Sequence, residues 1–248
     1  MMRKWVLFVW LIAQMGAIFG VEKRMKQVNY SVSVAVPCHY LHVKYLKRLL
    51  EAYQHQTVLP LEIIVSISQA NLVEHELAEI KKLQWPFPVF YLETNDRLGP
   101  GGNRNRATSQ ASGNVILFQD ADDLPHKQRV EIVKYLFEKY KIHHLIHRFT
   151  PFPESFSQRE IQPKYITIHD LKSAREAFMY FSRIQFGQCA VSKKAASEIA
   201  WESNQIMGED LKFCDSVIHQ LGCSVVIDTE LVNSETSGLP GLIQQGLL

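Results

Sequence analysis

One stretch, Val115-Ile116-Leu117-Phe118-Gln119-Asp120-Ala121-Asp122-Asp123, joins a run of apolar residues to three carboxylates. The apolar run predicts a strand that is covered on both faces, because large apolar residues follow one another without alternation. The acids are not expected inside that core, since burying an unpaired carboxylate is costly. They are expected at the carboxyl end of the strand, which is where open α/β sheets bind ligands.

These acids have two interpretations when they are taken alone. Carboxylates this close together repel one another, and a hard divalent cation such as Mg²⁺ or Mn²⁺ takes oxygen ligands of this kind. The alternative is a solvated turn that caps the next helix, since Asp is favoured both in turns and at helix N-caps. For an isolated Asp-x-Asp we favour the turn by roughly two to one, so the rest of the sequence has to decide.

The composition is that of an ordinary globular domain. The chain has 248 residues, of which 46% are hydrophobic and 21% charged, and this length is enough for one sizeable core. The formal net charge is +2, so the chain lacks the basic excess typical of nucleic-acid-binding proteins. No nucleic-acid partner is predicted.

The N-terminus differs from the rest of the chain. Residues 5–21 are almost entirely apolar and lie between basic flanks. This pattern predicts either a signal peptide cleaved after Gly20 or a short membrane anchor, since about 17 residues is the lower limit for spanning a bilayer. We exclude residues 1–25 from the fold and expect a protein of the secretory pathway, or one attached to a membrane through residues 5–21.

Cysteine and histidine spacing gives no clear metal motif. The chain has four cysteines: Cys38, Cys189, Cys214 and Cys223. None belongs to a Cys-x-x-Cys pair, so their spacing does not indicate a zinc site. A disulfide between Cys214 and Cys223 and buried free thiols are both compatible with the sequence. His143, His144 and His147 alternate on a predicted strand, and we interpret them as mostly structural.

Hydrophobic periodicity predicts alternating strands and helices. Strands are expected at 30–36, 61–67, 87–92, 115–118, 143–149, 186–192 and 224–227, and helices at 43–53, 73–83, 103–112, 127–140, 194–201 and 209–221. This β-α-β-α-β order implies a parallel sheet with right-handed crossovers. Pro37 is expected to end the first strand. Residues 150–175 are expected to form an irregular lid or acceptor loop, and residues 233–248 a loosely packed tail.

A glycine-rich segment precedes the acidic strand. Gly99, Gly101 and Gly102 occupy three of four positions, a density that is not expected in an ordinary helix. Such loops let backbone N–H groups approach a phosphate, and Arg104 and Arg106 add positive charge. The alternative is a flexible turn that leads into the next helix. The segment is not a P-loop, because no Gly-Lys-Ser/Thr follows.

A second acidic group follows at Gly208-Glu209-Asp210. Apolar residues at helical spacing come after it, so it marks the start of a helix. Acids in a first turn are favourable to the helix dipole, and that alone would explain them. A carboxylate that faces a cleft could equally act as a general base.

Taken in order, these pieces resemble the inverting glycosyltransferase family 2, which has the GT-A fold of nucleotide-sugar transferases. The matching segments are 33–37, 61–65, 99–107, 111–123 and 208–211. The resemblance covers roughly residues 30–232. It implies a Rossmann-like, three-layer α/β/α domain over residues 28–232 with a mostly parallel central sheet.

The resemblance also implies roles for the acids. Asp120 and Asp122 of the Asp-x-Asp motif would hold Mn²⁺ or Mg²⁺ against the diphosphate of the donor, a UDP-sugar. Asp123 would support them or touch the sugar. Asp210, with Glu209 beside it, would deprotonate an acceptor hydroxyl of a glycan, lipid or protein. The donor-binding residues implied are Pro37, Ser68, Gly99, Gly101, Gly102, Asn105, Arg106, Asp120 and Asp123.

One segment departs from the family pattern. The family usually has an Asp after the second strand that contacts the nucleotide base, whereas this chain has Ser66-Ile67-Ser68-Gln69-Ala70. A Ser or Gln could hydrogen-bond a uracil without the charge. This departure motivates one alternative, a GT-A-like domain that binds a nucleotide or glycan without catalysis. The other alternative is a sugar nucleotidyltransferase, which also has an α/β fold and also uses a metal ion.

Overall fold

The computed structural model describes residues 30–152, 156, 159–205 and 207–234. The predicted signal peptide or anchor at 1–25 lies outside the described residues, and the secretory or membrane location stays a prediction. Within the described ranges, no helix has both the length and the apolar character needed to cross a membrane.

The strands and helices predicted from periodicity are all present. The strands are β1 (Val32–His39), β2 (Glu62–Ser68), β3 (Val89–Thr94), β4 (Val115–Phe118), β5 (Leu124–Pro125), β6 (His144–Thr150), β7 (Ile168–Asp170), β8 (Ile184–Ser192) and β9 (Ser224–Asn233). The α-helices are α2 (Leu46–Gln54), α3 (Glu74–Lys81), α4 (Pro100–Gln110), α5 (Arg129–Tyr140), α7 (Ala177–Tyr180), α8 (Lys193–Glu198) and α9 (Glu209–Leu221). Short 3-10 helices lie at Tyr40–Tyr45, Ala70–Leu72, Pro163–Tyr165 and Ala174–Glu176.

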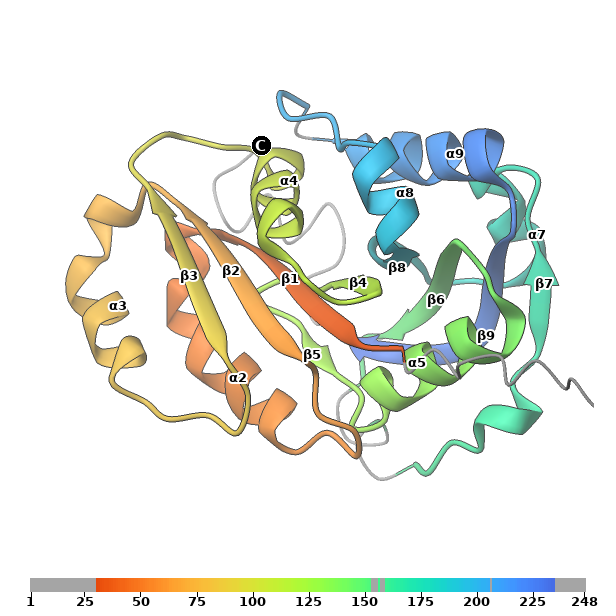
Figure 1. The fold of residues 1–248 in the computed structure, drawn as a ribbon, viewed down its shortest axis with the longest axis horizontal. Coiled ribbons are helices and arrows are strands. Elements are labelled where there is room, and N and C mark those ends of the chain that lie inside the picture. Colours follow the sequence, from red (N-terminus) through yellow and green to blue (C-terminus); the bar gives the residue numbers. More distant parts are fainter. Residues whose placement is uncertain (1–29, 153–155, 157–158, 206, 235–248) are drawn as a thin grey trace, which may run out of the picture.

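The strands form one mixed sheet in the order β3-β2-β1-β4-β8-β6-β9-β5, with β7 also paired to β9 (Figure 1). β1 to β4 are parallel, and β6 is parallel to β9. β8 is antiparallel to both β4 and β6, and β5 and β7 are antiparallel to β9. β1, β2, β3, β4, β6 and β9 therefore point in one direction. The predicted α/β fold with a mostly parallel sheet is confirmed.

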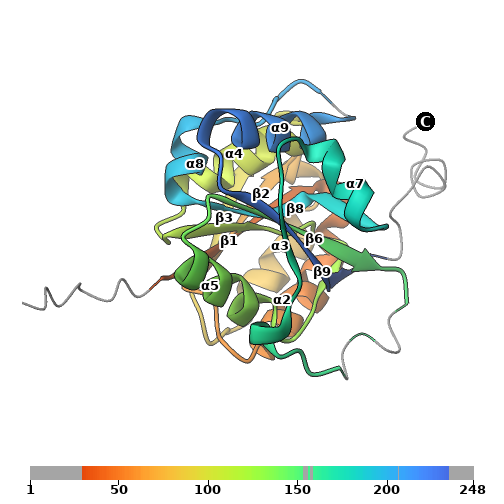
Figure 2. The same cartoon turned by 90° about the vertical axis from the view of Figure 1, so that its right-hand side faces the viewer.

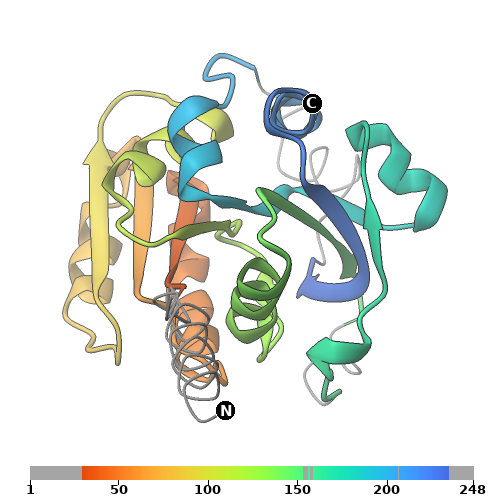
Figure 3. The ribbon, with the colours of Figure 1, turned by 45° about the vertical axis from the view of Figure 1, so that its right-hand side comes forward.

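Helices cover both faces of the sheet, which makes the three predicted layers (Figures 2 and 3). One core lies under α2, α3 and α5 and includes Leu46, Leu77 and Val133. The other lies under α4, α8 and α9 and includes Ala107 and Phe213. Two buried faces explain why β4 is apolar throughout: all four of its residues are buried.

β1 continues through Pro37 to His39, so the prediction that Pro37 ends the strand is wrong. The neighbouring strand β4 ends at Phe118, opposite Ala35. The carbonyl of Ala35 points toward β4 and accepts a hydrogen bond from the N–H of Gln119, at 3.1 Å. The backbone nitrogen of Pro37, two residues later, points toward the same side of the strand. The N–H that proline lacks would therefore point where β4 has already ended, and the sheet tolerates it.

The glycine-rich segment is helical, which corrects the prediction that three close glycines exclude an ordinary helix. Gly99 is the N-cap of α4, and Pro100 occupies the first turn, where its fixed φ is suitable. Gly101 is required by packing, because a Cβ there would lie 2.2 Å from the backbone oxygen of Glu202. The glycine thus lets a later part of the chain approach α4 closely.

The two helical glycines are expected to respond differently to alanine. Gly101→Ala should lower the free energy of unfolding by about 1–3 kcal/mol, because backbone must move to relieve the overlap. Gly102→Ala is the matched control: its nearest contact would be ordinary, at 3.5 Å from the Cβ of Leu98. The better helix propensity of alanine should make it neutral or stabilising, by up to about 1 kcal/mol. Urea unfolding of both variants tests this, and equal losses would contradict it.

Two segments predicted to be irregular are partly ordered. Within 150–175, β7 pairs with β9, so that segment is not wholly a loop. At the other end, Asn233 still belongs to β9, and the N–H of Ser234 donates to the carbonyl of Thr150 at 3.0 Å. Both residues are buried. The rest of the predicted tail lies outside the described residues.

Candidate active site

Five carboxylates gather where β4 ends and α9 begins. Asp120, Asp122 and Asp123 follow β4, and Glu209 and Asp210 form the first turn of α9. The charges of Asp122 and Asp210 both act on Asp120, so the groups are close in space although they are far apart in sequence. The structure therefore brings together the two acidic segments that the sequence singled out.

Arg104 of α4 joins the two groups. Its Nη2 donates to Oδ1 of Asp120 at 2.9 Å, and its Nη1 donates to Oε1 of Glu209 at 3.1 Å. The guanidinium lies over the ring of Trp201, 4.5 Å from the ring centroid, and Arg104 is only 3% exposed. Each buried charge thus has an opposite partner, which buried ion pairs need in order not to destabilise the fold. The sequence suggested only a charge directed at phosphate.

The surroundings of these acids shift their pKa values. Burial raises the pKa of Asp120; Arg104 opposes this, and the negative charges of Asp122 and Asp210 add to the rise. Burial likewise raises the pKa of Glu209, again opposed by Arg104. Glu209 is 6% exposed, whereas the side chain of Asp120 is 29% exposed. Of the two partners of Arg104, Asp120 is therefore the one that a ligand can reach.

Asp122 and Asp123 have different surroundings. The carboxylate of Asp122 lies 3.7 Å from Nδ1 of His42. Asp123 is buried, and its Oδ2 accepts a hydrogen bond from the side-chain amide of Gln188. Burial, together with the charges of Asp120 and Asp122, raises the pKa of Asp123 well above its ordinary value. Of the roles expected for Asp123, support of the cluster is the one that this burial favours.

Beneath the acids lies a fully buried arginine that the sequence analysis did not single out. Arg129 donates to the side chain of Gln119 and to the carbonyls of Phe118, at 3.0 Å, and Gln188, at 2.6 Å. It also donates to Nε2 of His147 at 3.0 Å. Burial and the charge of Arg129 lower the pKa of His147 to about 3, so this ring is a neutral acceptor. These bonds fix the chain on either side of the acidic turn.

The carboxyl ends of β1 and β2 form the neighbouring edge, where the nucleotide was expected. Pro37 lies in β1, two residues before His39, which pairs with Ser68 of β2. Ser68 is fully buried, and its hydroxyl accepts from the amide of Asn103 at 3.2 Å. Gln69 is only partly buried, and its Oε1 lies 3.0 Å from Nε2 of His39. Gln69 and His39 therefore present polar atoms at this edge, more than Ser68 does.

The remaining predicted donor residues lie on α4 and have structural contacts. The side chain of Asn105 donates to the carbonyl of Trp201 and accepts from its N–H, both at 2.9 Å. Arg106 donates to the carbonyls of Leu92, at 3.3 Å, and Glu93, at 3.1 Å. These bonds, like the close approach at the helical glycines, hold neighbouring segments on α4. A contact with the donor stays a prediction for these residues.

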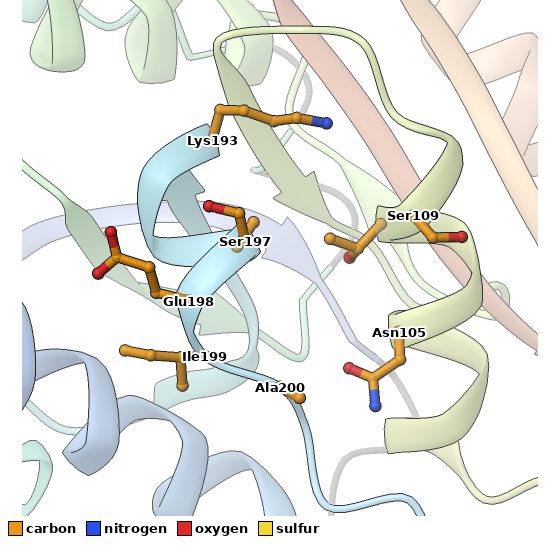
Figure 4. Close-up of a pocket in the computed structure, with 9 residues that line it drawn as sticks. Asn105, Ser109, Lys193, Ser197, Glu198, Ile199 and Ala200 are labelled. Atoms are coloured by element: carbon orange, nitrogen blue, oxygen red, sulfur yellow. The ribbon is translucent and has the colours of Figure 1, made fainter.

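A surface groove of about 460 Å³ separates α4 from α8 (Figure 4). Its lining consists of Asn105, Thr108, Ser109, Lys193, Ala196, Ser197, Glu198, Ile199 and Ala200. Of the predicted site residues it includes only Asn105, whose side chain is already bonded to Trp201. The groove is therefore separate from the carboxylate cluster, and the acidic end of the sheet remains the candidate active site.

A sequence model of glycosyl transferase family 2 matches residues 33–198, which is more than half of the chain. The chain belongs to glycosyl transferase family 2. The matched region runs from β1 through α8 and includes Asp120 and Asp122, but it ends before Asp210. The predicted family and the predicted enzyme class, a glycosyltransferase, are both confirmed.

Curated glycosyltransferases align with part of the chain. An uncharacterized glycosyltransferase of Methanocaldococcus jannaschii is 29% identical over 100 residues, which are 40% of this chain and 34% of that protein. A GalNAc(5)-diNAcBac-PP-undecaprenol beta-1,3-glucosyltransferase of Campylobacter jejuni is 34% identical over 94 residues, or 37% of this chain and 29% of that protein. The matched region thus spans about a third of the length of each relative.

Solved structures of other glycosyltransferases share the fold. S. aureus TarS in complex with UDP superposes with a TM-score of 0.65 at 18% identity, covering 82% of this chain and 60% of that one. Glucosyl-3-phosphoglycerate synthase from Mycobacterium tuberculosis, in complex with Mn²⁺, UDP and glucosyl-3-phosphoglycerate, superposes with a TM-score of 0.61 at 14% identity. It covers 87% of this chain and 76% of that one. The predicted GT-A fold is confirmed.

Proposed function

We propose that this glycosyltransferase moves a sugar from a UDP-sugar to an acceptor hydroxyl, with inversion at the anomeric carbon and with the help of Mn²⁺ or Mg²⁺. The observation that carries the proposal is the convergence of Asp122 and Asp210 on Asp120, whose Oδ1 accepts a hydrogen bond from Arg104. A direct displacement needs stabilisation of the leaving group and a base for the nucleophile, and the two acidic segments can supply one each. The UDP and Mn²⁺ in the structures of the neighbours support this choice of ligands.

Asp120 and Asp122 fit a hard divalent cation. Carboxylate oxygens are the ligands that Mg²⁺ and Mn²⁺ prefer. The charge of Asp122 helps to raise the pKa of Asp120, and a cation between them would remove that repulsion. When bound, such an ion would neutralise charge that develops on the diphosphate leaving group. Arg104, which bonds Oδ1 of Asp120, would hold this ligand in place.

Proton transfer is assigned to Asp210 and not to Glu209, although both were candidates. Glu209 is buried and bonded to Arg104, so its role is to position that arginine. Asp210 is partly exposed, and its Oδ1 accepts from the N–H of Leu211 at 2.7 Å, which orients the carboxylate. The acceptor hydroxyl would give its proton to Asp210 as its oxygen attacks the anomeric carbon and the bond to the diphosphate breaks. One direct displacement of this kind inverts the configuration.

The nucleotide is assigned to the carboxyl ends of β1 and β2. Gln69 offers an amide that can both donate to and accept from a uracil, and His39 lies against it. This pair takes the place of the acidic residue usual in the family. Base recognition at this edge is therefore expected to depend on neutral hydrogen bonds.

Thermal shifts with UDP and Mn²⁺ test the proposal. UDP with Mn²⁺ should raise Tm more than either alone, because a ligand at about a hundred times its Kd adds roughly 2.7 kcal/mol to the free energy of unfolding. Asp122→Asn should weaken Mn²⁺ binding by about 10- to 100-fold or more. Asp170→Asn, which changes an exposed carboxylate of β7, is the control and should behave as wild type.

The products separate the reaction classes. Incubation with a UDP-sugar and Mn²⁺ should release UDP, whereas a nucleotidyltransferase would release pyrophosphate. UDP binding that is independent of Mn²⁺ and unchanged in Asp122→Asn would contradict the metal assignment. A product that retains the anomeric configuration, read by NMR, would contradict the single displacement.

A further inference from the structure

A second cluster of metal-ligating side chains lies beneath α9, in the part of the chain that the structure describes. It consists of His144, Cys189 and Cys214, whose candidate ligand atoms all lie within 4.8 Å of one another. His144 pairs with Val191 across the β6–β8 ladder, so Cys189, two residues before Val191, lies on the same face of the sheet. Cys214 reaches this face from α9, which covers it.

His144 is the feature that calls for an explanation. The residue is fully buried, and neither of its ring nitrogens makes a hydrogen bond of normal geometry. Leaving a buried polar group unpaired costs about 1–3 kcal/mol, and native structures rarely do so without a reason such as a bound ion. The other histidines of this region have partners: His143 contacts Ser192, and His147 contacts the carbonyl of Arg148.

We propose that His144, Cys189 and Cys214 bind a zinc ion. Imidazole nitrogen and thiolate sulfur are the ligands that zinc takes in structural sites, whereas Mn²⁺ and Mg²⁺ prefer oxygen. Two thiolates and a neutral imidazole around Zn²⁺ carry no net charge, so the site suits an apolar interior. A water molecule would take the fourth tetrahedral position, as it does in other zinc sites that have three protein ligands.

The geometry of the cluster is close to what one ion requires. Zinc binds sulfur at about 2.3 Å and nitrogen at about 2.0–2.1 Å, so its ligand atoms lie roughly 3.5–4 Å apart. The ligand atoms now lie within 4.8 Å of one another, so they need to approach only slightly, which small changes in the side-chain torsions allow. The Cys214 sulfur lies 3.8 Å from the carbonyl oxygen of Phe186, a long contact that zinc binding would replace.

The location suggests what the ion would do. Cys214 lies four residues after Asp210, one helical turn along α9, and Cys189 follows Gln188, which bonds Asp123. An ion held by α9, β8 and β6 would therefore fix the helix that presents the carboxylates. The ligands come from three separate elements, so the sequence contains no short Cys-x-x-Cys motif that would predict this site.

Metal analysis of the reduced full-length chain tests the proposal. Wild type, dialysed against Zn²⁺ and then against metal-free buffer, should keep one zinc ion per chain, and zinc should raise its Tm. Cys189→Ser and Cys214→Ser should lose the bound zinc and the Tm shift. Cys38→Ser removes a thiol that is equally buried but lies in the other core, and it should keep both. Asp122→Asn should also keep the zinc, which separates this site from the proposed Mn²⁺ site.

Cobalt binding can be measured on the wild-type chain, so this test does not require that the cysteine variants fold. Co²⁺ added to the reduced wild-type chain should give an intense thiolate-to-cobalt charge-transfer band, which zinc then abolishes. Wild type that retains no zinc and gives no such band would overturn the proposal. So would a Cys189–Cys214 disulfide in the chain purified without reductant, seen as a mass lower by two hydrogens, if the chain after reduction still bound no zinc.

Discussion

Asp210→Asn is expected to lower kcat for UDP release by about 10²- to 10⁴-fold, which is the contribution typical of a general base. Asparagine keeps the size of the side chain, and its Oδ1 can still accept from the N–H of Leu211, so α9 should keep its first turn. What the variant loses is the ability to take a proton. The effect should therefore fall on kcat, with the KM for the UDP-sugar and the Tm close to those of wild type.

Glu209→Gln is the informative comparison for this prediction. Glu209 is bonded to Arg104 and buried, so its loss should mainly lower the free energy of unfolding and should affect proton transfer less. Asp170→Asn serves as the neutral control, because that carboxylate is exposed on β7. If Glu209→Gln abolished turnover at unchanged stability while Asp210→Asn retained it, the base would be Glu209, and the assignment made from burial would be wrong.

The sequence predicted the parts of the fold that depend on local pattern. The apolar run of β4 and the helical spacing of α5 and α9 are signals carried by consecutive residues, and the structure confirms them. Placement of Asp120 and Asp122 at the end of β4 followed from the cost of burying carboxylates, but Asp123 is buried, where Gln188 bonds it. The errors at Pro37 and at Gly101 have a different origin. Each depends on what lies opposite in space: the end of β4 in one case, the backbone of Glu202 in the other.

The same distinction applies to the site residues. Arg104 pairs with Asp120 and Glu209, and nothing in the local pattern of α4 says which acids it will meet. Arg129 had a usable signal, because it lies three and four residues before Ile132 and Val133 and so falls on the buried face of α5. Hydrophobic periodicity does not reveal a long-range ion pair, but it does reveal a charged residue on the apolar face of a helix. A charge at such a position predicts a buried partner even when the partner cannot be named.

Arg104→Met is expected to lower the free energy of unfolding by about 3–5 kcal/mol, because it leaves Asp120 and Glu209 without their cation. That is a large share of the 5–15 kcal/mol typical of a domain. With roughly 2–4 °C of Tm lost per kcal/mol at this size, Tm should fall by about 6–20 °C. Methionine can fill the space under Trp201, so the loss reports mainly on charge. Urea unfolding and calorimetry measure both quantities.

Two further variants decide whether the charge is responsible. Arg97→Met changes an exposed arginine and should alter stability by less than about 0.5 kcal/mol. Adding Glu209→Gln to Arg104→Met should restore about 0.5–3 kcal/mol, since it removes one of the two carboxylates left unpaired. Without that recovery, the loss would come from packing around Trp201 and not from the ion pairs.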